Sequence, residues 1–190
     1  CGICGGSGAG KTTLTRHLLE RLGPEQVSVL AFDAYYRDQG HLSPAERSLV
    51  NYDHPDSLDH ERFAADVEAL RGGETIAAPV YDFATHTRTT DVTIIEPRSI
   101  VIVEGILLLS FTEIADHLDL AVYIDVPEDV RLERDGQLAS DDLQLVVFQV
   151  DEQEGRRSAT LPNLTDVQPH RLEIADGASE LHVTTLVSKS

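Results

Sequence analysis

Largely apolar runs of four to six residues recur along the chain, separated by amphipathic and polar stretches. Val27–Phe32, Ile100–Val103 and Leu120–Ile124 are such runs, and Val101 to Val103 belong to a continuous β-branched series. Runs of this kind are typical of strands that are covered on both faces of a parallel sheet. The segments 143–150 and 182–187 have the composition of further strands. The pattern predicts a parallel sheet of about five strands.

Three stretches between these runs have helical periodicity. Leucines at positions 14, 18, 19 and 22 follow a glycine-rich loop and form one apolar stripe, which ends at the stop signal Gly23-Pro24. Ser43-Pro44-Ala45-Glu46 is a capping box that predicts a short helix to about Val50. A further helix is expected from His60 to Arg71. Alternating strands and helices predict an α/β fold in one domain.

Two short extended stretches, Ile76–Tyr81 and Asp91–Ile95, are joined by a polar turn around Thr85–Thr90 and predict a β-hairpin. Near the end of the chain the pattern weakens. Pro127 opens a helix that Asp135-Gly136 ends after little more than two turns. Residues 155–168 are polar and have no clear period.

Charge narrows the classes of partner. The 190 residues include 33 acidic and 15 basic side chains, a formal net charge of −18, and no basic patch interrupts the acidic composition. Nucleic acids and anionic membranes are therefore not expected partners. No apolar run approaches the roughly 20 residues that span a bilayer. Lysine occurs only at positions 11 and 189, which is consistent either with adaptation to high salt or with GC-biased coding.

Cys1 and Cys4 form a C-x-x-C pattern at the start of the chain, but Ile3 and Cys4 lead directly into the glycine-rich loop. A small apolar residue is needed at the end of a buried strand, so we interpret these cysteines as inert rather than as a redox pair. Without a disulfide framework or a signal peptide, the expected location is the cytoplasm.

The loop itself carries the first chemical signal. Gly5 to Thr12 fits G-x-x-x-x-G-K-[ST] between a strand and an amphipathic helix, which is the structural context of a phosphate-binding loop. Its glycines let backbone amides surround phosphate oxygens at a helix N-terminus. Lys11 is expected to reach the β- and γ-phosphates, and the Thr12 hydroxyl to ligate Mg²⁺. Such a loop occurs in kinases, GTPases and motors alike.

Two acidic residues at strand ends favour a kinase. Asp33 directly follows a buried strand, where its carboxylate could accept a proton from a hydroxyl that attacks the γ-phosphate. Glu104 also ends a buried strand and could hold Mg²⁺ directly or through water. Asp33 alone would be interpreted as a solvated strand-end aspartate or a helix cap. For Glu104 a surface glutamate is the less favoured interpretation, because it follows four consecutive β-branched residues.

At these residues the sequence resembles the uridine kinase (uridine–cytidine kinase) family of P-loop nucleoside kinases. The matching segments, in the family's order, are Gly5–Thr13, Asp33–Tyr36, Asn51–Asp56, Pro79–Arg88 and Glu104–Leu107. The similarity spans residues 1–134, which we interpret as the kinase core, with 135–190 as a divergent segment of the same domain. The resemblance implies the P-loop kinase fold with the hairpin over the substrate site.

The resemblance also implies a reaction: phosphorylation of the 5′-hydroxyl of uridine or cytidine to UMP or CMP in pyrimidine salvage. ATP is the expected donor, with GTP as an alternative, and Mg²⁺ the expected cofactor. By this resemblance Asp33 is the catalytic base and Asp53 binds the ribose hydroxyls. Tyr81 and His86 recognise the pyrimidine edge, Tyr52 and Phe83 form an aromatic wall, and Arg134 contacts substrate. The implied ATP-binding residues are Gly5, Gly6, Ser7, Gly8, Ala9, Gly10, Lys11, Thr12 and Thr13.

The chain then departs from the family, which continues with an arginine-rich lid helix. Asp129 to Arg134 begins like that helix, but the later arginines have no counterpart in register. Losing an arginine that neutralises the transferring phosphoryl group costs on the order of 10³-fold or more in rate, so slow turnover is expected. Arg156-Arg157 is typical of solvated side chains rather than of a substitute. The last 56 residues are either a divergent tail or the product of an altered reading frame.

Two alternatives stay open from the sequence. One is a P-loop kinase of another small hydroxyl acceptor, such as ribulose phosphate or pantothenate. The other is a nucleotide-binding protein without catalysis, because the lid is truncated. The expected partners are small molecules, a nucleoside and a nucleoside triphosphate, and the family's tetramers suggest a homo-oligomer.

Overall fold

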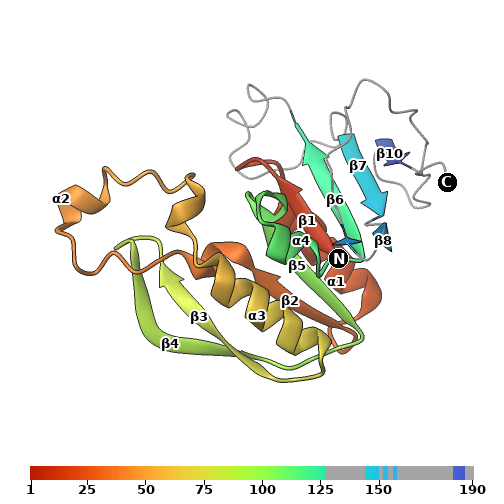
Figure 1. Ribbon diagram of the computed structural model, residues 1–190, viewed down its shortest axis with the longest axis horizontal. Coiled ribbons are helices and arrows are strands. Elements are labelled where there is room, and N and C mark those ends of the chain that lie inside the picture. Colours follow the sequence, from red (N-terminus) through yellow and green to blue (C-terminus); the bar gives the residue numbers. More distant parts are fainter. Residues whose placement is uncertain (127–143, 150–151, 154–155, 158–181, 187–190) are drawn as a thin grey trace.

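The computed structural model describes residues 1–126, 144–149, 152–153, 156–157 and 182–186. Within them six strands form one sheet in the order β10-β7-β6-β1-β5-β2 (Figure 1). The bounds of these strands are Gly2–Gly5 (β1), Val27–Ala31 (β2), Ile100–Gly105 (β5), Leu120–Asp125 (β6), Gln144–Gln149 (β7) and His182–Leu186 (β10).

The predicted parallel sheet is confirmed for four strands, because β1 pairs in parallel with β5 and β6, and β2 pairs in parallel with β5. The segments predicted at 143–150 and 182–187 are also strands. They do not extend the parallel set, however, since β7 runs antiparallel to β6, and β10 is parallel to β7. The predicted parallel sheet thus has four strands instead of about five, because at this edge an apolar run specifies a strand but not its direction.

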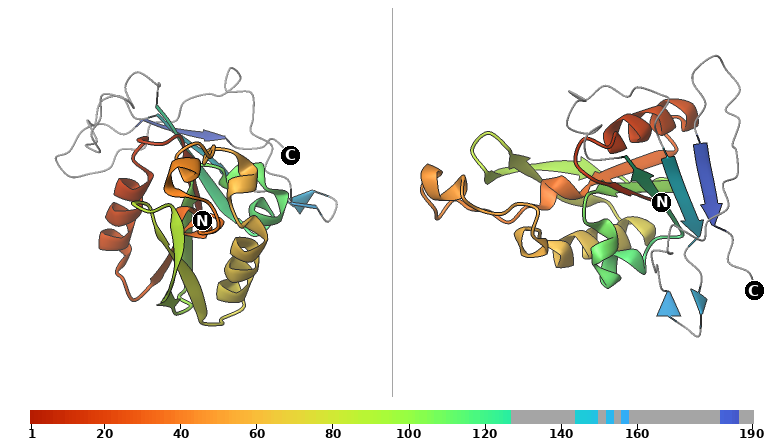
Figure 2. Two further views of the ribbon diagram at one scale, coloured as in Figure 1. Left: turned by 90° about the vertical axis from the view of Figure 1, so that its left-hand side faces the viewer. Right: turned by 90° about the horizontal axis from the view of Figure 1, so that it is seen from above.

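Helices cover both faces of the sheet. Helix α1 (Lys11–Leu22) lies on one face, and α3 (His60–Arg71) with the short α4 (Thr112–Ala115) lies on the other (Figure 2). Leu14, Leu18 and Leu19 pack against a core cluster that includes Ile3, as the apolar stripe predicts. Leu22, at the end of that stripe, is 42% exposed. The confirmed fold is thus α/β with two apolar layers, one on each side of β1 and β5.

Helix α2 (Pro44–Arg47) has the predicted capping box but is shorter than expected. The backbone N–H groups of Leu49 and Val50 donate to residues three positions earlier, Glu46 and Arg47, as in turns rather than in an α-helix. Leu49 is 85% exposed, so no apolar face holds a longer helix against the protein. The helix therefore ends at Arg47 instead of near Val50.

The predicted hairpin is confirmed as β3 (Ile76–Asp82) and β4 (Thr87–Ile95), which pair antiparallel. Its turn lies at residues 83–86, so it begins before the predicted polar turn and overlaps only the first part of it, and residues 87–90 belong to β4. The Asp82 carboxylate closes the turn by accepting from the Ala84 N–H at 2.9 Å and the Thr85 hydroxyl at 2.7 Å. The threonines that looked like turn residues are β-branched and fit a strand.

Shorter elements complete the described part of the chain. They are the 3₁₀ segments η1 (Phe32–Tyr35), η2 (Pro55–Ser57) and η3 (Leu108–Ser110) and the strands β8 (Glu152–Gln153) and β9 (Arg156–Arg157). The helix predicted to open at Pro127 lies outside the described residues, as does Arg134. Among the residues that the structure describes, no helix has the length and apolar character needed to cross a membrane.

Candidate active site

The phosphate loop connects β1 to α1 at the carboxyl edge of the parallel strands. Gly5 has φ 144°, and a Cβ there would lie 2.7 Å from the Ile124 carbonyl oxygen, so only glycine fits without a shift. Gly10 precedes the helix in the left-handed conformation, φ 94°, and no side chain caps the helix. The first amides of α1 therefore face the loop, in the arrangement that binds anions in proteins.

The Lys11 side chain fills the loop. It is 9% exposed, and its Nζ donates to the carbonyl oxygens of Gly5 at 3.1 Å and Gly6 at 3.0 Å. Neighbouring Cys4 is buried and free, and burial raises the pKa of its thiol to about 12. The inert interpretation of Cys4 agrees with this, because a thiol with so high a pKa forms little thiolate at neutral pH.

Glu104, at the end of β5, connects the loop to the neighbouring strand. Its two carboxylate oxygens accept hydrogen bonds from the Thr12 hydroxyl at 3.1 Å and the Thr15 hydroxyl at 2.7 Å. Thr12 and Thr15 are three residues apart and so share one face of α1. The structure thus brings the two predicted metal-binding residues, Thr12 and Glu104, into direct contact.

Asp33 lies in η1, immediately after β2. Its Oδ1 is buried and has no hydrogen-bond partner among the described residues. Burial raises the pKa of the Asp33 carboxyl above its ordinary value of 3.8, the charge of Lys11 opposes this shift, and the charge of Glu104 adds to it. Asp33 therefore lies within electrostatic reach of both Lys11 and Glu104, as expected for residues around one phosphoryl group.

A close backbone approach fixes these acids relative to each other. A Cβ on Gly105, directly after Glu104, would lie 2.6 Å from the Cβ of Phe32, directly before Asp33. The ends of β5 and β2 can come this close only because residue 105 has no side chain.

The oxygen donors of this edge fit a magnesium ion. Mg²⁺ prefers carboxylate and hydroxyl oxygens, and it usually takes only one or two protein ligands beside substrate phosphates and water. Thr12 and Glu104 supply such oxygens. No group of three or more His, Cys, Asp or Glu side chains that could hold a metal occurs within the part of the chain that the structure describes.

Aromatic side chains gather where the hairpin meets η1. The Tyr52 and His86 rings are stacked, with centroids 4.6 Å apart, and the Tyr81 and Phe83 rings meet edge to face at 5.2 Å. Tyr36 contacts three of these rings, those of Tyr52, Tyr81 and Phe83, at 5.3 to 6.3 Å. The four residues predicted for base recognition therefore form one cluster, with Tyr36 at its centre.

The polar atoms of this cluster have distinct environments. The Tyr81 hydroxyl is buried, and burial raises the pKa of Tyr81 far above its usual range, with further contributions from the charge of the Tyr52 hydroxyl and from a hydrogen-bond interaction with it. The Tyr52 hydroxyl donates its own hydrogen bond to the Arg47 carbonyl oxygen at 3.1 Å. Phe83 is 56% exposed, and His86 adopts a left-handed backbone, φ 54°.

Asp53 is exposed near this cluster. Its backbone N–H donates to the Asn51 side chain at 3.1 Å. Burial raises the pKa of Tyr36 to about 12, and the charges of Asp33 and Asp53 both add to the shift. The predicted ribose-binding acid and the predicted base are therefore both within electrostatic reach of the Tyr36 hydroxyl.

Three residues of the site were not predicted as functional. Thr15 lies about one helical turn after Thr12, a spacing that could have suggested its contact with Glu104. Tyr36 stands inside the matching segment after Asp33, without an assigned role. Arg88 ends another matching segment, and its guanidinium bonds to the Tyr35 and Tyr36 carbonyl oxygens at 3.2 and 3.0 Å.

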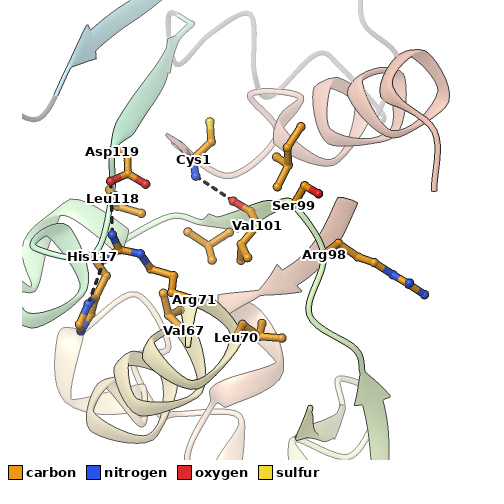
Figure 3. A pocket seen from close by; sticks show the side chains of 12 residues that line it. Cys1, Val67, Leu70, Arg71, Arg98, Ser99, Val101, His117, Leu118 and Asp119 are labelled. Atoms are coloured by element: carbon orange, nitrogen blue, oxygen red, sulfur yellow. Dashed lines mark hydrogen bonds and ion pairs between the residues drawn. The ribbon is translucent and has the colours of Figure 1, made fainter. Parts of the chain in front are cut away.

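A separate cavity of about 310 Å³ lies at the opposite edge of the sheet (Figure 3). Cys1 and Val101, near the amino ends of β1 and β5, line it together with Arg71, His117 and Asp119. Arg71 donates to the Asp119 carboxylate at 3.3 Å and contacts His117 Nδ1 at 3.5 Å. Since the phosphate loop and Glu104 follow the carboxyl ends of the same strands, this cavity is not part of the candidate active site.

Comparison with known proteins agrees with this geometry. Uridine kinases from Shewanella piezotolerans and Clostridium perfringens (strain SM101) are 44% and 43% identical to the chain over 141 and 133 residues. The matches cover 70% of this chain and only 66% and 64% of those proteins, so the chain spans slightly less than two thirds of their length.

A solved structure of a kinase attributed to a fructose transport system of Silicibacter sp. TM1040 has a TM-score of 0.58 and 25% identity, and the match covers 69% of this chain and 68% of that one. The model of the phosphoribulokinase / uridine kinase family matches residues 1–141, which include the phosphate loop, both strand-end acids and the hairpin. The chain therefore belongs to the phosphoribulokinase / uridine kinase family.

Proposed function

We propose that this protein transfers the γ-phosphoryl group of ATP to the 5′-hydroxyl of uridine or cytidine. One observation carries the proposal: Asp33, with a buried and unpartnered carboxylate oxygen, lies within electrostatic reach of Lys11 in the phosphate loop and of Tyr36 in the aromatic cluster. The names of the curated relatives, which are uridine kinases, support the choice of acceptor.

On the donor side, the loop amides and Lys11 bind the phosphates. Lys11 already lies in the loop, held by two carbonyl oxygens, and exchanges these contacts for charge-assisted bonds to phosphate oxygens. Thr12 and Glu104 would hold Mg²⁺. When bound, Mg²⁺ offsets negative charge on the phosphates.

On the acceptor side, Asp33 accepts the proton of the 5′-hydroxyl. Its raised pKa suits this role, because a base with a pKa nearer the working pH holds a proton more readily once it has accepted it. Asp53 accepts hydrogen bonds from the ribose hydroxyls. Tyr81 and His86 bind the pyrimidine edge, and Tyr52 and Phe83 pack against the ring. A phenol and an imidazole can each donate or accept, which allows both uracil and cytosine.

Arginine side chains are expected to neutralise the transferring phosphoryl group only in part. Arg134 is proposed to contact substrate, but it lies outside the described residues, and the later arginines of the family's lid have no counterpart in register. We therefore propose slow turnover rather than a change of reaction. GTP as an alternative donor, a role in pyrimidine salvage, a cytoplasmic location and a homo-oligomer stay predictions.

The test is an assay of ADP release with ATP and Mg²⁺, using uridine, cytidine, ribulose 5-phosphate, pantothenate and fructose as acceptors. The expected result is turnover of the two nucleosides only, with UMP or CMP as product. Asp33→Asn is the control: it should abolish turnover and leave ATP affinity nearly unchanged. Activity on a sugar or pantothenate alone, or tight binding of ATP and uridine without product over hours, would contradict the proposal.

A further inference from the structure

Arg88 joins the base-recognition hairpin to the segment that carries Asp33. In the hairpin register Arg88 stands directly opposite Tyr81, which is proposed to bind the pyrimidine edge. Its guanidinium leaves the hairpin and donates through Nη2 to the carbonyl oxygens of Tyr35 and Tyr36, at 3.2 and 3.0 Å. These residues follow Asp33 by two and three positions. One side chain thus bonds two parts of the site that are about 50 residues apart in sequence.

Two aspartates hold Arg88 in place. Nη1 donates to the Asp59 carboxylate at 3.2 Å, and the Arg88 side chain is only 19% exposed. The Arg88 backbone N–H donates to the Asp38 carboxylate at 3.1 Å. Asp59 in turn donates its backbone N–H to the Tyr35 carbonyl oxygen at 2.9 Å. The guanidinium therefore lies in a closed set of bonds around Tyr35 rather than on an open surface.

The contacts of Arg88 also carry a cost. Its Nε–H is buried without an acceptor among the described residues, which is a cost to the folded state. A planar guanidinium bonds an aspartate and two carbonyl oxygens at once through its fork, which a lysine ammonium on a flexible stem cannot reproduce. The geometry selects arginine in particular.

We propose that Arg88 is a positioning residue that fixes the distance between the base-binding hairpin and Asp33, so that binding of the base orients the 5′-hydroxyl for transfer. The proposal rests on the proposed function. In such an arrangement the binding energy of the base, remote from the reacting atoms, raises the rate of transfer as well as affinity. For an acceptor without a base, Arg88 should not raise the rate of phosphoryl transfer.

The experiment compares kcat/KM for uridine with kcat/KM for methyl β-D-ribofuranoside, which has the 5′-hydroxyl but no base. In Arg88→Lys this ratio should fall by about 10²-fold, the scale expected when a reacting group is misplaced by about 1 Å. The loss should appear in kcat for uridine, and KM for ATP should not change. Asp59→Asn should lower the ratio in the same direction and gives a second test if the first variant does not fold.

Arg62→Lys is the matched control. Arg62 also connects a helix to the hairpin, donating to the Ala77 carbonyl oxygen at 3.1 Å, but it is more exposed and contacts the opposite end of β3. In Arg62→Lys the ratio of kcat/KM for uridine to kcat/KM for methyl β-D-ribofuranoside should equal that of the wild type. Equal losses for both acceptors in Arg88→Lys would show a merely structural role and overturn the inference alone. Failure of the wild type to phosphorylate uridine would overturn the proposed function, and this inference with it.

Discussion

The Asp33 carboxyl is held in the folded protein at a cost that depends on pH. Burial raises its pKa above the ordinary value of 3.8, so the folded state binds this proton more tightly than the unfolded state does. Its contribution to stability is therefore most favourable below pH 3.8. It declines as the pH rises through the folded-state pKa, and at neutral pH the buried anion destabilises the protein.

Asp33→Asn is accordingly expected to raise thermal stability at pH 7 while it abolishes transfer. A gain of about 1 kcal/mol would raise Tm by about 2–4 °C in a chain of this size. The measurement is thermal unfolding between pH 4 and 8, where the advantage of the variant should grow with pH. Asp91→Asn, on an exposed residue of β4, should give no such trend. A variant that is less stable than the wild type at pH 7 would contradict the inference that the buried Asp33 carboxylate destabilises the folded state at that pH.

Two tyrosine hydroxyls offer a contrast between function and stability. Tyr81→Phe removes a buried hydroxyl that interacts with the neutral Tyr52 hydroxyl and with no charged group at hydrogen-bond distance among the described residues, so the free energy of unfolding should fall by about 1 kcal/mol or less. The variant should bind uridine about 10-fold more weakly if the hydroxyl bonds the base. Calorimetric titration with uridine measures this affinity.

Tyr35→Phe is the comparison variant. Its hydroxyl donates to the Asp66 carboxylate at 2.6 Å, and removal should cost about 1.5–3 kcal/mol of stability, as for hydrogen bonds to charged groups. If Tyr81→Phe were the more destabilising of the two, or if it left uridine affinity unchanged, the proposed role of Tyr81 would be refuted.

At the scale of elements, helix α1 and strand β5 are joined through Glu104. Thr15 is buried and donates to one carboxylate oxygen of Glu104, while Thr12 donates to the other. Thr15 therefore orients a residue that would hold Mg²⁺. Outer partners of metal-binding residues typically contribute 10–100-fold to metal affinity.

Thr15→Val removes this hydroxyl and keeps the shape of the side chain. The Mg²⁺ concentration for half-maximal activity should rise by about 10-fold or more. Thr15→Ser, which keeps the hydroxyl, should behave as the wild type in the same titration. An identical Mg²⁺ requirement in Thr15→Val would show that Glu104 needs no such support.

Elements with a strong local signal were predictable, and those decided by distant contacts were not. The phosphate loop and the helix after it follow from glycines, a lysine and an apolar stripe that are adjacent in sequence. The turn of the hairpin depended on the Asp82 carboxylate, and the direction of β7 depended on its partner β6. In the candidate site, Asp33 and Glu104 could be predicted from strand ends, whereas the guanidinium of Arg88 bonds to carbonyl oxygens, which have no sequence signature.

For the whole molecule, the net charge of −18 implies self-repulsion in the folded state. Added NaCl should therefore raise Tm, by about 2–4 °C for each kcal/mol of relieved repulsion. Because the Debye length falls from about 10 Å at 0.1 M to about 3 Å at 1 M, most of the gain should occur below 1 M.

Unfolding followed at 0.05 to 3 M NaCl distinguishes screening from adaptation to high salt. A plateau above 1 M is the expected result for screening of surface charge. A rise that continues to 3 M would favour a protein adapted to multimolar salt. A Tm that falls with salt would contradict both interpretations.

Because Gly105 has no side chain, the strand ends that carry Glu104 and Asp33 can lie in close contact. Any larger residue there would press on Phe32 and displace Asp33 while it also moved Glu104. A substitution at position 105 is therefore expected to disturb both acids at once, unlike a substitution of either acid alone.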